Sequence, residues 1–102
     1  MSVKKRYLKN KPVCKVTLSL PKSVADSARE VYIVGEFNDW DQMANPMQAL
    51  KNGSFKSTLE LPIGHTYQFR YLIDKDRWEN EPGADQHISN DLTGDDNSVI
   101  VT

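Results

Sequence analysis

Residues 67–73 read Tyr-Gln-Phe-Arg-Tyr-Leu-Ile, and every second side chain from Tyr67 onward is aromatic or aliphatic. A period of two is typical of a β-strand that turns one face toward a core. The positions in between form the opposite face, which carries Gln68 and Arg70. When the aromatic side chains pack inward, Arg70 is expected to point to solvent beside Gln68.

Short strand patterns recur along the chain and indicate the fold class. Residues 13–20 alternate between apolar and polar side chains, and residues 31–35 form a β-branched run that suits a strand buried on both faces. Further strands are predicted at 46–50, 55–61, 77–79 and 99–101, with turns at 52–53, 62–64 and 74–76. Residues 21–30 are interpreted as a loop with one weak helical turn, and residues 85–97 as a surface loop. This spacing predicts an all-β fold, an antiparallel β-sandwich of immunoglobulin-like size, with a small barrel as the alternative.

The composition fits one small domain. The chain has 102 residues and a net charge of −1, which argues against a nucleic-acid or membrane partner. One cysteine excludes an internal disulfide, and with only two histidines the usual zinc ligand sets are missing, so no metal or cofactor is expected. No apolar run approaches a membrane span or a signal peptide, and a cytoplasmic location is expected.

The charges are distributed unevenly along the chain. Residues 1–22 hold seven bases and no acid, whereas residues 23–102 hold six bases and 14 acids. We expect residues 1–11 to form a flexible basic N-terminal arm and residues 12–102 to form the β-sandwich domain. Arms of this kind are more often solvated ends than sites for an acidic polymer.

Two tryptophans, Trp40 and Trp78, stand in polar surroundings and each has two interpretations. The indole either fills the edge of the core or forms a flat plate on which a sugar ring stacks. A glucose ring has apolar C–H faces, hydroxyls at its edge and no charge, so its site needs aromatic surface with hydrogen-bonding groups at the rim. Arg70 is either a solvated strand charge or a guanidinium that donates to sugar hydroxyls.

The chain carries no catalytic signature. Its paired carboxylates are adjacent in turns, as in Asp95-Asp96, whereas glycoside hydrolysis needs two carboxyls about 5–10 Å apart across a cleft. Phosphate loops, nucleophile elbows and calcium loops are also absent from the sequence. We therefore expect a non-catalytic protein.

Two stretches carry a family resemblance. Residues 31–40 read Val-Tyr-Ile-Val-Gly-Glu-Phe-Asn-Asp-Trp, and residues 67–74, Tyr-Gln-Phe-Arg-Tyr-Leu-Ile-Asp, are followed by Trp78. Together with the ending at 96–101, this combination resembles carbohydrate-binding module family 48. That family includes the early-set domain at the N-terminus of isoamylases and glycogen branching enzymes, and the glycogen-binding domain of the AMP-activated protein kinase β subunit.

The resemblance implies an early-set sandwich of about seven strands that binds α-1,4-glucan: glycogen, starch, maltooligosaccharide or cyclodextrin. It implies an amylolytic enzyme of the glycoside hydrolase family 13 type, or a kinase, as an associated protein. By match to the kinase-type domain, the carbohydrate-binding residues would be Trp40, Arg70, Trp78, Leu92, Thr93, Asp96 and Asn97. Asp96 aligns with an asparagine of that domain, which leaves Asn97 as a displaced contact or a structural turn residue. The alternative function is a structural or protein-interaction early-set domain that binds sugar negligibly and buries both indoles.

Overall fold

A computed structural model of the protein describes residues 1–89 and 95–102. These residues form nine β-strands, one α-helical turn and one 3-10 turn, which confirms the all-β fold class. In chain order the elements are β1 (Ser2–Tyr7), β2 (Val13–Leu20), α1 (Lys22–Ala25), β3 (Val31–Gly35), η1 (Glu36–Asn38), β4 (Gln48–Ala49), β5 (Phe55–Pro62), β6 (Thr66–Ile73), β7 (Arg77–Glu79), β8 (Gln86–Ser89) and β9 (Asp96–Val101).

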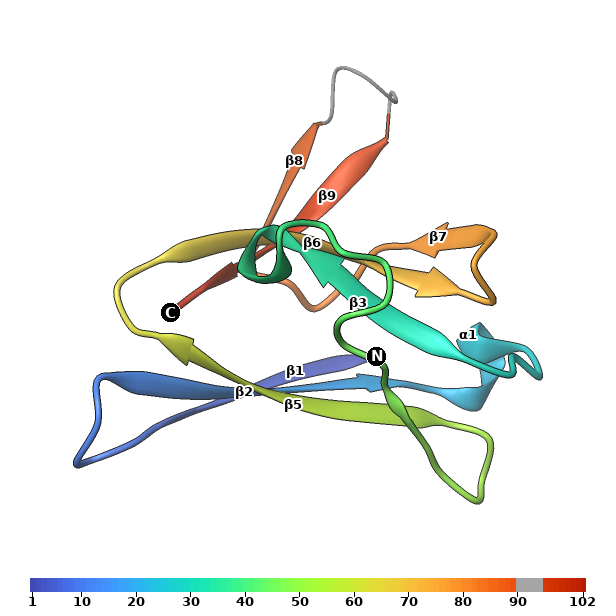
Figure 1. Ribbon diagram of the computed structural model, residues 1–102, viewed down its shortest axis with the longest axis horizontal. Helices are drawn as coiled ribbons and strands as arrows, with labels where there is room; N and C mark the ends of the chain where they lie inside the picture. The colour runs from blue at the N-terminus through green and yellow to red at the C-terminus, as the bar shows by residue number, and fades with distance from the viewer. Residues whose placement is uncertain (90–94) are drawn as a thin grey trace.

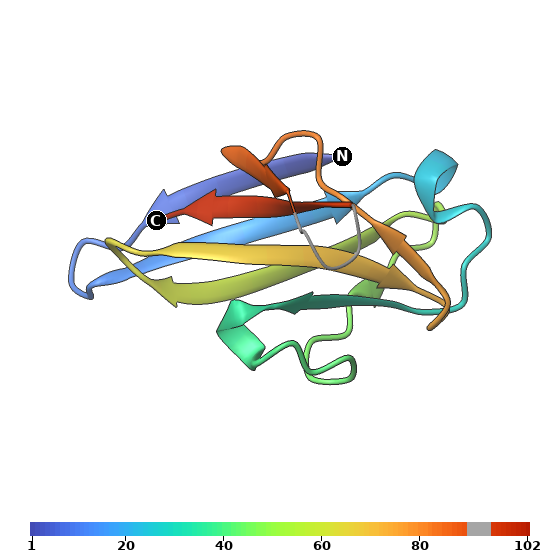
Figure 2. The same cartoon turned by 90° about the horizontal axis from the view of Figure 1, so that it is seen from above.

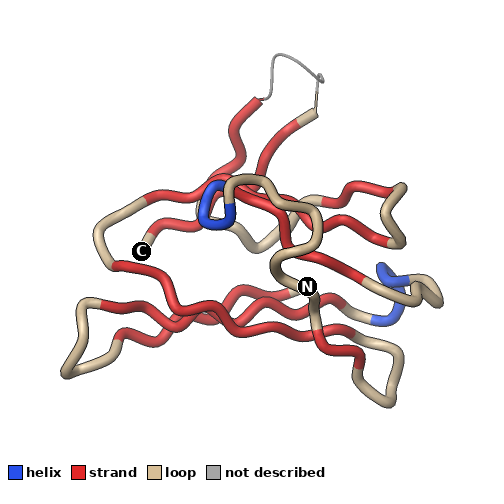
Figure 3. Tube along the Cα trace, viewed as in Figure 1, coloured by secondary structure: helices blue, strands red, loops and turns tan. Residues whose placement is uncertain are grey.

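The strands form two separate antiparallel sheets that face each other (Figure 1). Sheet A has the order β1-β2-β5-β4, and sheet B has the order β3-β6-β9-β8, with β7 also paired to β6. Seen from above, η1 and the segment after it lie outside β3 at one edge of sheet B (Figure 2). Within residues 1–89 and 95–102 the other connections are loops, and helix is confined to two short turns (Figure 3). Two facing sheets make a sandwich, so the small-barrel alternative is wrong.

The core lies between the sheets and follows the alternation in the sequence. Every second residue of β2 is fully buried, from Cys14 to Leu20, while the residues between them are half-buried. From sheet B, Phe69 and Tyr71 point inward, and their rings meet edge to face with centroids 5.7 Å apart. Burial of these side chains at about 25 cal/mol per Å² of apolar surface is the main stabilising term.

The expected flexible arm is wrong for residues 2–7, which form β1 and pair with β2 along their whole length. Lys5 Nζ lies 2.5 Å from Asp85 Oδ2, and the same oxygen accepts a hydrogen bond from the Val101 amide at 2.7 Å. Burial raises the pKa of Asp85, but the hydrogen bonds from Lys5 and Val101 and the Lys5 charge lower that pKa by more. The carboxylate of Asp85, the residue just before β8, therefore holds the edge strand β1 of sheet A. Local composition does not reveal this long-range contact.

Part of the expected loop at 85–97 is also a strand. Gln86–Ser89 forms β8, which pairs with β9, and β9 begins at Asp96 instead of at the predicted Val99. Every residue of β8 is exposed. Because neither face of the strand is buried, it lacks the alternation by which strands are recognised in a sequence.

One carboxylate, that of Glu81, is buried in the interior. The Tyr71 hydroxyl donates to Glu81 Oε1 at 2.9 Å, and the Gly83 amide donates to Glu81 Oε2 at 2.7 Å. Burial, followed by the charge of Glu81, raises the pKa of Tyr71 well above its ordinary value of 10.0. The phenol therefore stays protonated in the folded state and serves as a donor to the buried carboxylate.

We predict that Tyr71→Phe lowers the free energy of unfolding by about 1–3 kcal/mol, because a buried carboxylate loses a donor. The wild-type protein should also lose stability as the pH rises above 10.0, the ordinary tyrosine pKa. There the unfolded chain ionises Tyr71 while the folded chain does not. Urea unfolding at neutral and alkaline pH measures both effects, and the variant should show a shallower alkaline loss.

Tyr32→Phe is the matched control. Its hydroxyl donates to Glu30 Oε2 at 3.2 Å from a half-buried position, so the loss should stay below about 0.5 kcal/mol. Equal losses in the two variants would contradict the role assigned to the Tyr71–Glu81 bond.

Candidate functional site

The strand register brings the candidate site residues to the outer face of sheet B. In β6, Arg70 shares this face with Leu72, because the positions between them point into the core. Val34 of β3 lies opposite Arg70, and Trp78 of β7 lies opposite Leu72. Directly opposed residues of antiparallel strands lie on the same face, so Trp78 and Arg70 are diagonal neighbours on this surface.

Arg70 is buried on this face, with only 7% of its surface exposed. Arg70 Nε donates to Asn97 Oδ1 at 2.6 Å, and Arg70 Nη1 lies 3.9 Å from Asp95 Oδ2. The guanidinium carbon lies 6.0 Å from the centroid of the Trp78 ring, within the range of a cation–π contact. The expectation that Arg70 points to solvent is therefore wrong: the predicted face is right, but Trp78 and the start of β9 cover the side chain.

Asn97 uses both ends of its amide inside the protein. It accepts from Arg70 and donates through Nδ2 to Gln68 Oε1 at 3.0 Å, and it is 5% exposed. The backbone N–H of Gln68 donates separately to Oε1 of Glu36, the first residue of η1, at 2.6 Å. A chain of polar contacts thus runs from β9 across β6 to the turn that precedes Trp40.

Trp78 is presented by a tight hairpin between β6 and β7. Asp74 and Lys75 both have positive φ, at 51° and 64°, and the Asp74 carboxylate accepts the amides of Arg29 and Glu30. Trp78 is 40% exposed, which is high for a residue type that is usually well buried.

Trp40 follows a turn that is fixed by the side chain of Asn38. Asn38 Oδ1 accepts the Gly35 amide, and Nδ2 donates to the Ile33 carbonyl, at 3.1 and 3.0 Å. Asp39 and Trp40 then adopt positive φ, at 56° and 58°, which is strained for non-glycine residues. The backbone N–H of Trp40 donates to the Gly35 carbonyl at 2.8 Å, and Trp40 as a residue is also 40% exposed.

Gly35 allows this turn to sit against β6. A Cβ at this position would lie 2.5 Å from the Gln68 carbonyl oxygen and 2.7 Å from Phe69 Cβ, so only glycine fits. The segment from Gly35 to Trp40 is part of the stretch that carries the family resemblance. In the structure, its glycine allows the close approach to β6 and its asparagine fixes the turn.

A concavity of about 370 Å³ opens beside Trp78. It is lined by Arg70, Trp78, Glu79, Asn80, Pro82, Asp95 and Asp96. Asn80 closes one wall, since its Nδ2 donates to the Asp96 carbonyl at 2.6 Å while its Oδ1 accepts from Ser98 at 2.8 Å. Of the lining residues, Glu79, Asn80, Pro82 and Asp95 were missed by sequence reasoning, because only the pairing of β7 with β6 and of β6 with β9 brings them together.

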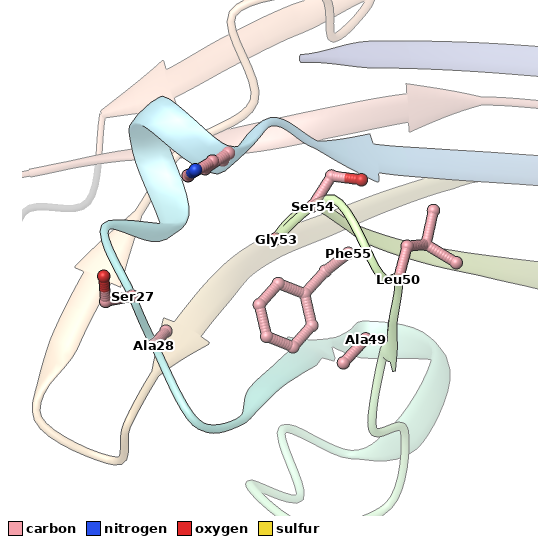
Figure 4. Close-up of a pocket in the computed structure, with 8 residues that line it drawn as sticks. Ser27, Ala28, Ala49, Leu50, Gly53, Ser54 and Phe55 are labelled. Carbon is pink, nitrogen blue, oxygen red and sulfur yellow. The ribbon is translucent and has the colours of Figure 1, made fainter.

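A second concavity, of about 200 Å³, lies between α1 and the turn before β5 (Figure 4). The ring of Phe55 lies between Ala28 and Ala49, with Ser27 and Gly53 at the rim. Phe55 is buried, so this concavity offers no exposed aromatic plate. The surface beside Trp78 therefore fits a stacking ligand better.

Of the three remaining predicted site residues, the structure describes only Asp96. Asp96 begins β9 as an exposed residue in the lining of the first concavity, whereas Leu92 and Thr93 lie outside the described residues. Among residues 1–89 and 95–102, no three His, Cys, Asp or Glu side chains gather closely enough to hold a metal ion. The same residues include no helix long and apolar enough to cross a membrane.

A β-sandwich that exposes two indoles, one of them beside a polar concavity, is typical of a small carbohydrate-binding module. The chain belongs to the family described as the glycogen recognition site of AMP-activated protein kinase, which matches residues 24–102. The resemblance to carbohydrate-binding module family 48 is thereby confirmed. The family is thus one of glycogen-recognition modules.

One curated relative is 1,4-alpha-glucan branching enzyme GlgB from Pseudomonas putida, which is 41% identical over 51 residues. The aligned part makes up 47% of this chain and 7% of that enzyme. The chain therefore spans only a small fraction of the length of this relative.

We predict that Arg70→Ala lowers the free energy of unfolding by about 2–3 kcal/mol, because it leaves the buried amide of Asn97 without its donor. Arg6→Ala is the control, since Arg6 is exposed on β1 and should cost less than about 0.5 kcal/mol. Urea denaturation of both variants provides the comparison. A loss at Arg70 as small as that at Arg6 would mean that the guanidinium is solvated.

Proposed function

We propose that the protein binds α-1,4-glucan on the outer face of sheet B, with the indoles of Trp40 and Trp78 as stacking plates. The observation that carries this proposal is Trp78, a residue 40% exposed at a polar concavity, with the Arg70 guanidinium within 6.0 Å of its ring centroid. The apolar faces of glucose rings would cover the indoles, while hydroxyls at the ring edges meet the polar lining. Membership of a glycogen-recognition family supports the same ligand class.

The polar residues divide into two roles in this proposal. Arg70 supports the Trp78 plate, and Asn97 holds Arg70 in place through the hydrogen bond from Arg70 Nε to Asn97 Oδ1. Asp96 stands at the rim as an acceptor for sugar hydroxyls. Leu92 and Thr93 are proposed glucan contacts on the resemblance alone.

The expected affinity is modest. Each covered indole removes apolar surface from water at about 25 cal/mol per Å², and the lost freedom of the bound sugar opposes this gain. Two such contacts correspond to dissociation constants between about micromolar and millimolar. The protein would thus bind glucan reversibly. An associated enzyme of the glycoside hydrolase family 13 type, or an associated kinase, would thereby be brought to the same polymer.

The exposure of the indoles argues against the alternative of a sugar-free early-set scaffold. That function expects neighbouring side chains to bury both indoles, whereas each tryptophan residue is 40% exposed.

We predict that Trp78→Ala and Trp40→Ala each weaken binding of maltoheptaose or β-cyclodextrin by about tenfold or more, which corresponds to about 1.4 kcal/mol or more. Isothermal titration calorimetry measures the loss, and circular dichroism verifies that the variants remain folded. Tyr7→Ala removes another exposed aromatic residue, on sheet A, and should leave the affinity unchanged. Undetectable binding by the wild-type protein at millimolar ligand, or an equal loss in Tyr7→Ala, would contradict the proposal.

A further inference from the structure

The concavity beside Trp78 has an unbalanced charge. Its lining holds one base, Arg70, and three acids, Glu79, Asp95 and Asp96, which gives a formal charge of −2 (one positive and three negative). The Asp95 side chain is 72% exposed, and Asp96 is exposed as well. The other indole has acids on both sides, since the exposed residues Asp39 and Asp41 flank Trp40.

The one cation at this concavity is not displayed to a ligand. Arg70 is more than nine-tenths buried and is engaged by Asn97 and Asp95. An arginine that recognises a phosphate group does so with its forked donors free and accessible. What the concavity offers an approaching ligand is therefore predominantly negative charge and hydrogen-bond acceptors.

Exposed cations gather on the opposite side of the sandwich. Arg6 of β1 pairs in register with Lys15 of β2, and Lys4 lies two residues away on the same outer face of sheet A. Like charges at directly opposed positions repel each other. The two sheets are about 10 Å apart, and salt screens charges over about 8–10 Å, so these cations cannot neutralise an anion at Trp78.

From this charge distribution, and on the basis of the proposed glucan site, we infer that the protein selects neutral α-1,4-glucan and rejects glucan that carries phosphate esters near the bound rings. Glucose hydroxyls donate hydrogen bonds to carboxylates. A phosphate monoester has a charge of about −1.5 to −2 and offers mainly acceptor oxygens, so it replaces a donor with a repelled anion. The discrimination thus comes from an unfavourable interaction with the wrong ligand.

The test compares one polymer in two states. A soluble starch fraction that bears glucose 6-phosphate esters is used before and after phosphatase treatment, and binding is measured by calorimetry at low salt. We expect the dephosphorylated glucan to bind about tenfold more tightly. In about 0.5 M NaCl the difference should shrink, because the screening length falls.

Charge variants assign the discrimination to the concavity. The double variant Glu79→Gln/Asp96→Asn removes two of the three negative charges and should reduce the affinity ratio between the two glucans about threefold or more. Glu60→Gln removes an exposed acid on the outer face of sheet A and should leave the ratio unchanged. The ratio is informative even if the double variant also alters affinity for neutral glucan.

Each outcome has one consequence. A preference for dephosphorylated glucan that weakens in the double variant and in salt supports the inference. Equal binding of both glucans, or an unchanged ratio in the double variant, overturns the inference and leaves the proposed glucan site standing. Binding of neither glucan by the wild-type protein overturns the glucan site itself and the inference with it.

Discussion

The burial of one positive charge, the guanidinium of Arg70, organises the outer face of sheet B. A buried cation costs several kcal/mol unless it is paired and hydrogen-bonded. The partners of Arg70 come from different strands. Asn97 belongs to β9, and Trp78 belongs to β7, where it is the diagonal neighbour of Arg70. The contacts that Arg70 makes with Asn97 and Trp78 therefore fix the Trp78 indole, the centre of β6 and the start of β9 relative to one another.

A plate fixed in this way suits a ligand that is uncharged and weakly bound. Glucan loses conformational freedom on binding, so a surface that must also become ordered would have little net affinity left. The polar chain from Arg70 through Asn97 and Gln68 to Glu36 also reaches the turn that holds Trp40. The neighbour of Trp78, Arg70, and the first residue of the turn before Trp40 are thus linked through β6, while sheet A supplies much of the core behind it.

Local sequence was sufficient for the elements that bury one face. The alternation in 13–20 and 67–73 and the apolar run at 31–35 predicted β2, β6 and β3, because the core imposes its period on the side chains. The edge strands β1 and β8 were missed, since their pairing depends on distant partners such as the Lys5–Asp85 ion pair and not on an apolar stripe.

The candidate site shows the same division. The period of β6 correctly placed Arg70 on the outer face, but a period says nothing about what covers that face. The covering residues lie eight or more positions away in the sequence, at Trp78 and Asn97, and meet Arg70 only through strand pairing. Neither the placement of Glu79 and Asp95 in the concavity nor the hydrogen bond between Asn97 and Gln68 has any local signature.

The most direct test of a glucan site on this face is a titration of the ¹⁵N-labelled protein with maltoheptaose, followed by NMR. The chain has two tryptophans and hence two indole N–H signals. If glucan stacks on the outer face of sheet B, both signals should shift along the same titration curve, together with amides of β6, β7 and the start of β9, while those of β1 and β2 remain in place. Stationary indole signals, or shifts centred on sheet A, would contradict this placement of the site.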